Sequence, residues 1–391
     1  MPMNTDILIV GGGPAGLSFA RALAPSGLRI TLLERQGTDT LSEPAYDGRE
    51  IALTHRSIRS LRELGAWQRI GDEHKSPLRS ARVLNGGSPL ALTFDTGDRP
   101  EGELGVLVPN QQIRRALYAS IEGQDDLTIL SGVSVATART GNAGAEVTLT
   151  DGTVLKSRLL VAADSRFSSL REQLGIGVEI NRLGRAMLVC RVDHEREHDH
   201  VATESFDVPH TIAMLPLNGR TSSAVITLPQ DEAERLAEAS DEALSESITA
   251  MYRRRLGTMR VAGSRHVYPL ATTFSRRFVV PGGALIGDAA VGMHPVTAHG
   301  FNLGLQSAVT LASEIRGALR RGEDWAGDAP LQSYEKTHRL ASRPIYTATN
   351  MIVRLYSDHR PPAQLARHAA IRLGRRLPFL NGAVRSMLLQ A

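Results

Sequence analysis

The sequence predicts an α/β fold in which a Rossmann-like domain with a GxGxxG turn carries an inserted mixed β-sheet and ends in helices. Three observations support this prediction. The apolar run Ile7–Val10 leads into a glycine-rich turn and a helical pattern. Polar, strand-like segments fill 182–273, and a buried β pattern returns at Phe278–Ile286 before further helices. The chain therefore leaves its first domain and comes back to it.

The first domain is predicted from alternating strands and helices. We expect a strand at Asp6–Val10, a helix at Pro14–Ala24 and a second strand at Arg29–Glu34, which together form a βαβ unit. Apolar residues recur at helical spacing in Ser57–Leu64 and in Gln111–Ile121, which predicts a helix in each.

The inserted region is predicted from shorter β patterns. Residues 128–163 alternate in short β runs, with Asp151 and Gly152 as a hairpin turn. The stretch 182–273 is the best candidate for a sheet that covers a substrate, and it contains one charged helical segment, Asp231–Arg255. The expected division is 1–75, 106–180 and 276–360 for the nucleotide-binding domain, 76–105 and 181–275 for the inserted substrate domain, and 361–391 for a helical C-terminal segment.

Composition excludes several classes of protein. The net charge of +4, from 45 basic and 41 acidic residues, is too small to indicate nucleic-acid binding. No apolar stretch is long enough to span a bilayer, and the first residues lack the basic start of a signal peptide. The single cysteine, Cys190, excludes an intrachain disulfide, and no His and carboxylate spacing predicts a metal site. A cytoplasmic protein is expected.

The glycine-rich turn at residues 11–16 predicts dinucleotide binding. Gly11 permits a tight turn, Gly13 lets backbone N–H groups approach a pyrophosphate, and Gly16 allows the helix to pack closely on the strand. Glu34 ends the second strand, where its carboxylate would accept a hydrogen bond from a ribose hydroxyl. The nucleotide contacts expected from this region are Gly11, Gly13, Pro14, Ala15, Gly16, Glu34 and Arg35.

A second glycine-containing segment lies far away in sequence. Glu34 would repel the 2′-phosphate of NADP, which leaves FAD or NAD for this site. Near the other end of the chain, a buried run delivers Gly287 and Asp288, and Pro295 and Gly300 follow in a loop that leads into a helix. An acid at a strand end before such a loop predicts a second turn that faces the ligand.

Two stretches carry a resemblance to a known family. They are Asp47–Thr54 and the run GDAAVGMHPVTAHGFNLGL, which begins at Gly287. The chain resembles the FAD-dependent aromatic-ring monooxygenases of the p-hydroxybenzoate hydroxylase superfamily. Within it, the chain is most similar to the ubiquinone-biosynthesis hydroxylases of the UbiH, UbiF and UbiM type, with the UbiM group closest. The resemblance covers the chain from the first strand to the late helices.

The resemblance implies FAD as the cofactor and assigns further contacts to it. Asp288 would hydrogen-bond a ribose or ribityl hydroxyl, and Pro295 with 300–302 would lie along the isoalloxazine ring. Arg49 and Asn110 would also meet the cofactor, although a surface salt bridge and an ordinary helix N-cap are the alternatives for these two. The contacts that the resemblance adds are Arg49, Asn110, Asp164, Gly287, Asp288, Pro295, Gly300, Phe301 and Asn302.

The chain departs from the family pattern in two places. Ser165 follows Asp164 where the family has glycine, which would cost about 1 kcal/mol if this residue needed a positive φ. His299 also differs from the usual residue. With Pro295 it is a candidate for a role beside the flavin, either as a general base or, alternatively, as a histidine that packs within the loop.

The function implied is an FAD-dependent monooxygenase that uses NAD(P)H and O₂ to hydroxylate an aromatic ring. The expected substrate is a lipophilic, polyprenylated phenol of ubiquinone biosynthesis, and a biosynthetic complex is an expected partner. Three alternatives stay open: a hydroxylase of a small soluble aromatic compound, a prenyl reductase, and a non-catalytic flavin-binding subunit of such a complex.

The C-terminal stretch 364–377 places arginines on one helical arc and apolar residues on the other. Such a helix can lie on an anionic membrane surface, here the inner membrane, or can cap the core with a solvated basic face.

Overall fold

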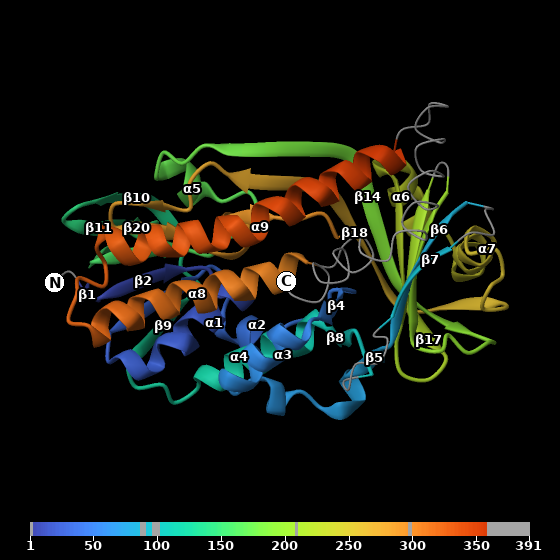
Figure 1. Cartoon of the computed structure of the whole chain (residues 1–391), viewed down its shortest axis with the longest axis horizontal. Helices are drawn as coiled ribbons and strands as arrows, with labels where there is room; N and C mark the ends of the chain where they lie inside the picture. The colour runs from blue at the N-terminus through green and yellow to red at the C-terminus, as the bar shows by residue number, and fades with distance from the viewer. Residues whose placement is uncertain (1–2, 87–90, 96–101, 208–209, 296–298, 358–391) are drawn as a thin grey trace.

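The computed structural model describes residues 3–86, 91–95, 102–207, 210–295 and 299–357. Figure 1 shows two parts side by side: an α/β part that contains the N-terminus, and a large curved sheet beyond it. Two long strands, β14 (Val178–His194) and β18 (Met259–Ser275), run from one part into the other. The α/β part and the sheet are thus joined by continuous backbone.

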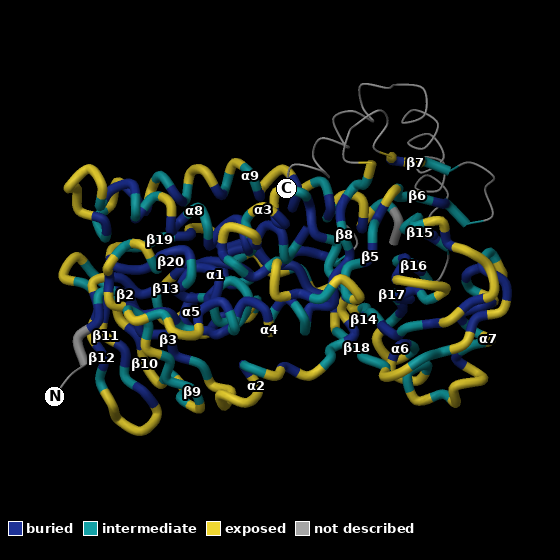
Figure 2. The backbone as a smooth tube through the Cα atoms, turned by 90° about the horizontal axis from the view of Figure 1, so that it is seen from below, coloured by how far each residue is buried: buried dark blue, intermediate teal, exposed yellow. Residues whose placement is uncertain are grey.

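A six-stranded sheet forms the centre of the α/β part. Its order is β19-β20-β13-β2-β3-β9, and all its pairs are parallel except β19 with β20. The central strands are fully buried and continuously apolar, as expected of a parallel sheet covered on both faces; they form the dark core in Figure 2. The strands are β2 (Ile7–Val10), β3 (Ile30–Glu34), β9 (Leu127–Ser131), β13 (Leu159–Ala162), β19 (Val279–Val280) and β20 (Gly283–Leu285).

The buried β pattern predicted at Phe278–Ile286 is confirmed. The structure divides it into two short antiparallel strands, β19 and β20. Gly282, with φ +69°, makes the turn between them, and a Cβ there would lie 2.7 Å from the Gly141 carbonyl oxygen. Pro281 and Gly282 separate the two strands, and a Pro-Gly pair is a sequence signal for such a turn.

Helices cover this sheet close to their expected positions. The predicted first helix is α1 (Pro14–Leu23), and the two later ones are α3 (His55–Glu63) and α4 (Asn110–Ile121). Thr54 caps α3, because its hydroxyl accepts a hydrogen bond from Ser57 N at 3.2 Å. The remaining helices here are α2 (Thr38–Ser42), α5 (Ser169–Gln173), α8 (Gly300–Arg320) and α9 (Asp328–Ser357).

Two small sheets complete the α/β part. The strands β10 (Val135–Gly141), β11 (Gly144–Leu149) and β12 (Val154–Ser157) form a meander beside β1 (Met3–Asn4). Gly152 has φ +86° between β11 and β12, which confirms the predicted hairpin turn. The other small sheet pairs β4 (Glu50–Leu53), β8 (Gly105–Pro109) and β5 (Ser76–Leu78).

The large sheet has eight strands in the order β21-β18-β14-β17-β16-β15-β6-β7. Helices α6 (Gln230–Ala237) and α7 (Asp241–Met251) cover one of its faces through a second apolar core. We call the opposite face the inner face. The strands not yet given are β6 (Ser80–Asn85), β7 (Ala91–Asp95), β15 (Val201–Phe206), β16 (Thr211–Pro216), β17 (Thr221–Pro229) and β21 (Val291–Gly292).

The prediction of one helix over Asp231–Arg255 is wrong. The chain breaks between α6 and α7, where Ser240 accepts a hydrogen bond from Ala243 N at 3.2 Å and so caps a new helix. The end of the expected helix is also irregular, because Arg253 and Arg254 have positive φ. A Ser-Asp-Glu sequence at 240–242 is an N-terminal signal that could have revealed the break.

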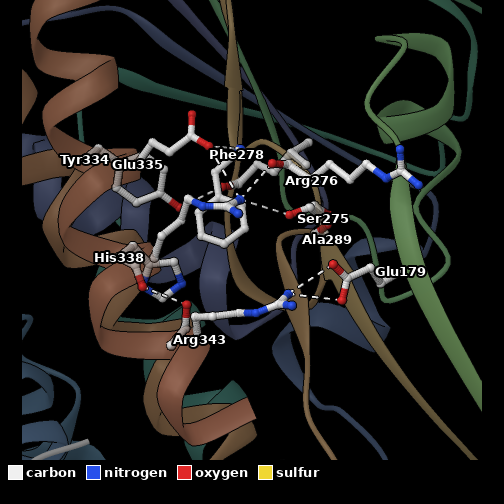
Figure 3. Close-up of polar contacts among 12 residues, drawn as sticks. Glu179, Ser275, Arg276, Phe278, Ala289, Tyr334, Glu335, His338 and Arg343 are labelled. Carbon is white, nitrogen blue, oxygen red and sulfur yellow. Dashed lines mark hydrogen bonds and ion pairs between the residues drawn. The ribbon is translucent and has the colours of Figure 1, made fainter. Parts of the chain in front are cut away.

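Helix α9 ties the two parts together, and Figure 1 shows it running from the α/β part towards the large sheet. Figure 3 shows Glu335 and Arg343 of α9 pointing at the region where β18 ends. Phe278 N donates to Glu335 Oε1 at 3.1 Å, and Arg343 forms an ion pair of 3.0 Å with Glu179 of β14. No helix within the described ranges is long and apolar enough to cross a bilayer.

Candidate functional site

The glycine turn between β2 and α1 requires glycine at two positions. Gly11 has φ +113°, and a Cβ there would lie 2.3 Å from the Ala163 carbonyl oxygen. A Cβ on Gly16 would lie 1.9 Å from the Gly11 carbonyl oxygen. Both distances are shorter than any real contact, so α1 can approach β2 and β13 this closely only without these side chains.

Gly13 is different, because a Cβ on it would meet no protein atom within 4 Å. It occupies the N-cap of α1 without a side-chain cap, and Pro14 follows at the first helical position. The unpaired N–H groups and the positive end of the helix dipole therefore face open space. Backbone of this kind is suited to hold a pyrophosphate.

Glu34 ends β3, as predicted, and its side chain lies against the glycine turn. Its carboxylate accepts hydrogen bonds from Gly12 N at 2.6 Å and from Gln36 N at 2.9 Å. A carboxylate has further lone pairs, so Glu34 can also accept from ribose hydroxyls. Arg35 is exposed, and no hydrogen bond or ion pair of the described chain involves its side chain.

The two glycine segments meet in space. Gly287 lies just beyond β20 with φ +60°, and a Cβ on it would lie 2.8 Å from Cβ of Ala15. Ser307 of α8 fixes this turn by accepting a hydrogen bond from Gly287 N at 2.8 Å. The start of the chain and a turn near its other end thus border one site at the carboxyl ends of the parallel strands, where α/β proteins bind their ligands.

Asp288 has a partner that the sequence analysis did not identify. Arg166 forms an ion pair of 3.1 Å with it and donates a second hydrogen bond to Ala271 O at 2.6 Å. Arg166 therefore links the Asp288 turn to strand β18. The position of Arg166 two residues after Asp164 was the available signal.

The side chain of Asp164 has a buried oxygen, Oδ1, that has no hydrogen-bond partner in the described structure. Its Cα would lie 2.9 Å from a Cβ on Gly11, so this acceptor is adjacent to the glycine turn. A hydroxyl donor from a bound nucleotide would satisfy it. Ser165 does not have a positive φ, so the backbone strain that a positive φ would cause at this residue does not arise.

Arg49 and Asn110 converge on Asp47. Arg49 forms an ion pair of 2.5 Å with the Asp47 carboxylate, and Asn110 donates to it at 2.7 Å. Burial alone would raise the pKa of Asp47, but the Arg49 charge and these hydrogen bonds outweigh it, so the pKa is lowered. The N-cap alternative for Asn110 is wrong, since Pro109 occupies the N-cap of α4. The alternative for Arg49, an ion pair, is observed. The pair lies next to β18, because the Tyr268 hydroxyl of this strand donates a hydrogen bond to Asp47 O at 2.6 Å.

Asn302 fixes the start of α8 through hydrogen bonds of its side chain. Its side chain accepts from Thr54 N at 3.2 Å and donates to Ala52 O at 2.9 Å, which ties α8 to the end of β4. Gly300 and Phe301 begin the same helix, so their backbone lies at its positive end. Pro295 is partly exposed and His299 is buried, and the residues between them are not described.

His294 precedes this loop in a neutral state. Burial, followed by the nearby charges of Arg166 and Arg185, lowers its pKa to about 4. A general-base role for His299 stays a prediction.

A buried carboxylate that the sequence analysis missed lies between the two parts. The Glu50 side chain is 0% exposed, and Arg191 of β14 reaches its Oε1 at 2.7 Å. Tyr46 donates to the same oxygen at 3.3 Å, while Oε2 has no partner in the described structure. Burial raises the pKa of Glu50 despite the opposing Arg191 charge. No local pattern could reveal this pair, because its members are on different domains.

The inner face of the large sheet closes the site. Arg191, His266 and Tyr268 lie on it and contact the loop 46–50. His266 packs against Gly48, where a Cβ would lie 2.7 Å from its ring, and edge-on to Tyr46 at 5.8 Å between ring centroids. Glycine at 48, with φ +75°, allows this approach.

Comparison with known proteins agrees with this geometry. The family described as FAD binding domain matches residues 4–349. Ubiquinone hydroxylase UbiM of Neisseria meningitidis is 44% identical over 99% of this chain and 85% of its own length. Ubiquinone hydroxylase UbiL of Rhodospirillum rubrum is 34% identical over 94% of this chain and 85% of its own.

Solved structures show the same fold. The p-nitrophenol 4-monooxygenase PnpA of Pseudomonas putida superposes with a TM-score of 0.79 over 100% of this chain and 99% of its own, at 16% identity. The probable FAD-dependent monooxygenase pqsL of Pseudomonas aeruginosa gives a TM-score of 0.72 over 89% of this chain and 94% of its own, at 21% identity.

The residues present fit an FAD. The open backbone at Gly13, the carboxylate of Glu34 and the unpartnered oxygen of Asp164 supply the groups that a diphosphate and its hydroxyl-bearing chains require. The family match spans both glycine segments and the inserted sheet. The chain therefore belongs to the FAD binding domain family, in its group of ubiquinone hydroxylases, and is an FAD-dependent monooxygenase.

Proposed function

We propose that this enzyme hydroxylates the ring of a lipophilic phenol in ubiquinone biosynthesis, with NAD(P)H as electron donor and O₂ as co-substrate. The proposal rests on one observation: the glycine turn that contains Gly13 and the turn at Gly287 lie together, next to the separate large sheet. The names of the relatives UbiM and UbiL support the choice of substrate. The inner face of the sheet, with Met187, Val189 and Val225 on adjacent strands, supports a lipophilic one.

In this mechanism, the residues of the chain bind the cofactor and orient the substrate. The flavin, when bound, supplies the electron transfer and the activation of oxygen. The backbone at Gly13 would hold the diphosphate, while Glu34, Asp164 and Asp288 would accept hydrogen bonds from hydroxyl groups of the cofactor. The neutral His294 adds no charge beside the loop. The inner face excludes water from the reacting ring.

The experiment uses the purified yellow protein with a phenol that carries a short prenyl chain. We expect NAD(P)H oxidation to rise on addition of this phenol, and ¹⁸O₂ to add one labelled oxygen to the product by mass. 4-Hydroxybenzoate, a small aromatic acid, is the comparison compound. Release of hydrogen peroxide without a labelled product, or turnover of 4-hydroxybenzoate alone, would contradict the proposal.

We also propose peripheral contact with the inner membrane and with a biosynthetic complex. The basic segment 361–391 on which membrane contact rests lies outside the described residues. Co-sedimentation with vesicles that contain anionic lipid should fall as salt is raised. Equal binding to neutral vesicles would argue against an electrostatic contact.

A further inference from the structure

The inner face of the large sheet carries a carboxyl group on a row of otherwise apolar strand residues. Glu204 lies on β15, directly opposite Ala213 of β16 and Val83 of β6. The row continues in one direction to Leu92 of β7. In the other direction it passes through Val225 and Val189.

The orientation of Glu204 follows from this register. Residues that lie opposite one another on adjacent strands share a face of the sheet. Met214 and Ile212 flank the position opposite Glu204 and belong to the core under α6 and α7. Ala213, and with it Glu204, must therefore be on the other face, which is the inner face.

The row ends at the site already described. Val189 is opposite His266 of β18, and His266 packs against Gly48 and Tyr46. Glu204 therefore shares a face with residues that contact the cofactor domain. Glu204 is partly exposed.

No group in the described structure offsets the Glu204 charge. None of the hydrogen bonds or ion pairs of the described residues involves its carboxyl group, and Arg191 on the same face is engaged by Glu50. Burial, without any opposing partner, raises the pKa of Glu204 to about 8. The side chain is thus predominantly a neutral acid at pH 7, with one O–H donor and free acceptor capacity.

A carboxyl group in such surroundings destabilises the folded protein unless something hydrogen-bonds to it. We propose that Glu204 positions the substrate, with its protonated carboxyl group hydrogen-bonding an oxygen substituent on the aromatic ring while the apolar residues of its row contact the lipophilic part. This inference rests on the proposed function, because it assumes an aromatic substrate against the inner face. It makes Glu204 a specificity-determining residue that no glycine or family motif reveals.

The test compares Glu204→Leu and Glu204→Gln with a control on the same strand, Ser205→Ala. Ser205 is opposite Ile212, on the face covered by the helices, and is buried. Each protein is prepared with FAD. We measure flavin content, the melting temperature without substrate, and the KM for the phenol with a short prenyl chain.

We expect Glu204→Leu to raise the KM about tenfold, since it removes the hydrogen bond, and Glu204→Gln to raise it only about threefold. Both should retain FAD. Glu204→Leu should also raise the melting temperature by about 2 °C, because it removes an unpartnered carboxyl group. Ser205→Ala should leave the KM unchanged.

A residue with a merely structural role would behave in the opposite way. A lower melting temperature for both Glu204 variants with an unchanged KM would overturn the inference. If the unsubstituted protein converts the phenol and Glu204→Leu does so with the same KM, the inference fails while the proposed function stands. If the unsubstituted protein neither binds nor hydroxylates the phenol, the proposed function fails first.

Discussion

The glycine turn and the inner face of the sheet border the same site but are built in different ways. The turn uses backbone, and its key residues Gly11 and Gly16 are required because a Cβ would collide with main-chain atoms. The inner face uses side chains such as Glu204 and Arg191, whose neighbours come from strands far apart in sequence. On our proposals, the diphosphate of the cofactor would therefore be held mainly by backbone groups, and the substrate by particular side chains.

This difference predicts which half of the site tolerates amino-acid substitutions. Main-chain donors at a helix N-terminus suit any diphosphate, so a turn of this kind serves many reactions. Side chains on the sheet can be exchanged while the backbone stays fixed. We expect substitutions in the turn to affect folding and FAD together, and those on the inner face to affect stability and substrate separately.

The largest expected effect comes from Gly16→Ala. The added Cβ would lie 1.9 Å from the Gly11 carbonyl oxygen, and backbone cannot move aside as a flexible side chain can. We expect a loss of several kcal/mol of stability, on the order of 3 kcal/mol, and little soluble yellow protein. Urea unfolding followed by circular dichroism measures the change.

Two matched variants separate folding from cofactor binding. Gly13→Ala adds a Cβ that meets no protein atom within 4 Å, so the protein without FAD should keep its stability while FAD affinity falls. Gly141→Ala, also without a neighbour within 4 Å, should change neither. If Gly13→Ala binds FAD as tightly as the unsubstituted protein, the diphosphate does not rest at this turn.

The second prediction concerns the buried pair between the two parts. Arg191→Met leaves the fully buried Glu50 carboxylate without its cation, and we expect a loss of about 1–3 kcal/mol, since Arg191 itself is 36% exposed. Arg343→Met breaks an ion pair in which both side chains are about half exposed, and it should cost less than about 1 kcal/mol. Urea unfolding compares them, and equal losses would show that burial of Glu50 does not matter.

Most of the cofactor domain could be predicted from the sequence because its signals are local. Strand β2, the turn and helix α1 follow one another within a few residues, and each glycine has a steric reason on the spot. The expected helices at α3 and α4 lie within two residues of their observed ends. The error, at α6 with α7, occurs where a short turn interrupts a periodic pattern.

The inner face could not be predicted in the same way. Whether Glu204 points inward depends on its pairing with Ala213 and Val83, and a shift of one residue would turn it to the other face. The partner of Glu50 is likewise on another domain. The family resemblance pointed to Arg49 and Asp288, which match a shared motif, and gave no role to Glu204.

A third prediction uses pH, because helix α9 and the inner face of the sheet bury titratable groups of opposite kind. His338 of α9 packs on Tyr334 and Phe278, and burial lowers its pKa to about 3. The folded state therefore binds fewer protons than the unfolded one, so stability is lost as pH falls from about 6.5 towards 3. For Glu204, with a pKa raised to about 8, stability is instead lost as pH rises from about 4.5 through 8.

Each group should contribute up to about 1.4 kcal/mol per pH unit within its own window. Urea unfolding from pH 4 to 9 measures both limbs. His338→Phe should flatten the acid limb alone and Glu204→Gln the alkaline limb alone. His74→Phe, at a partly exposed histidine of a 3-10 turn, is the control and should change neither. Flattening of the acid limb by Glu204→Gln would reverse the sign assigned to that group.

The smallest expected effect is that of Ser165→Gly, which restores the residue usual in the family. Glycine would stabilise the turn by about 1 kcal/mol only if residue 165 had a positive φ, and Ser165 does not have one. We therefore expect no gain, and a loss of up to about 0.5 kcal/mol from the greater freedom of glycine in the unfolded chain. A gain of 1 kcal/mol in urea unfolding would mean that the backbone at this turn is strained. The rule drawn from Gly11 and Gly16, that glycine is needed only where a Cβ or a negative φ cannot fit, would then extend to residue 165 as well.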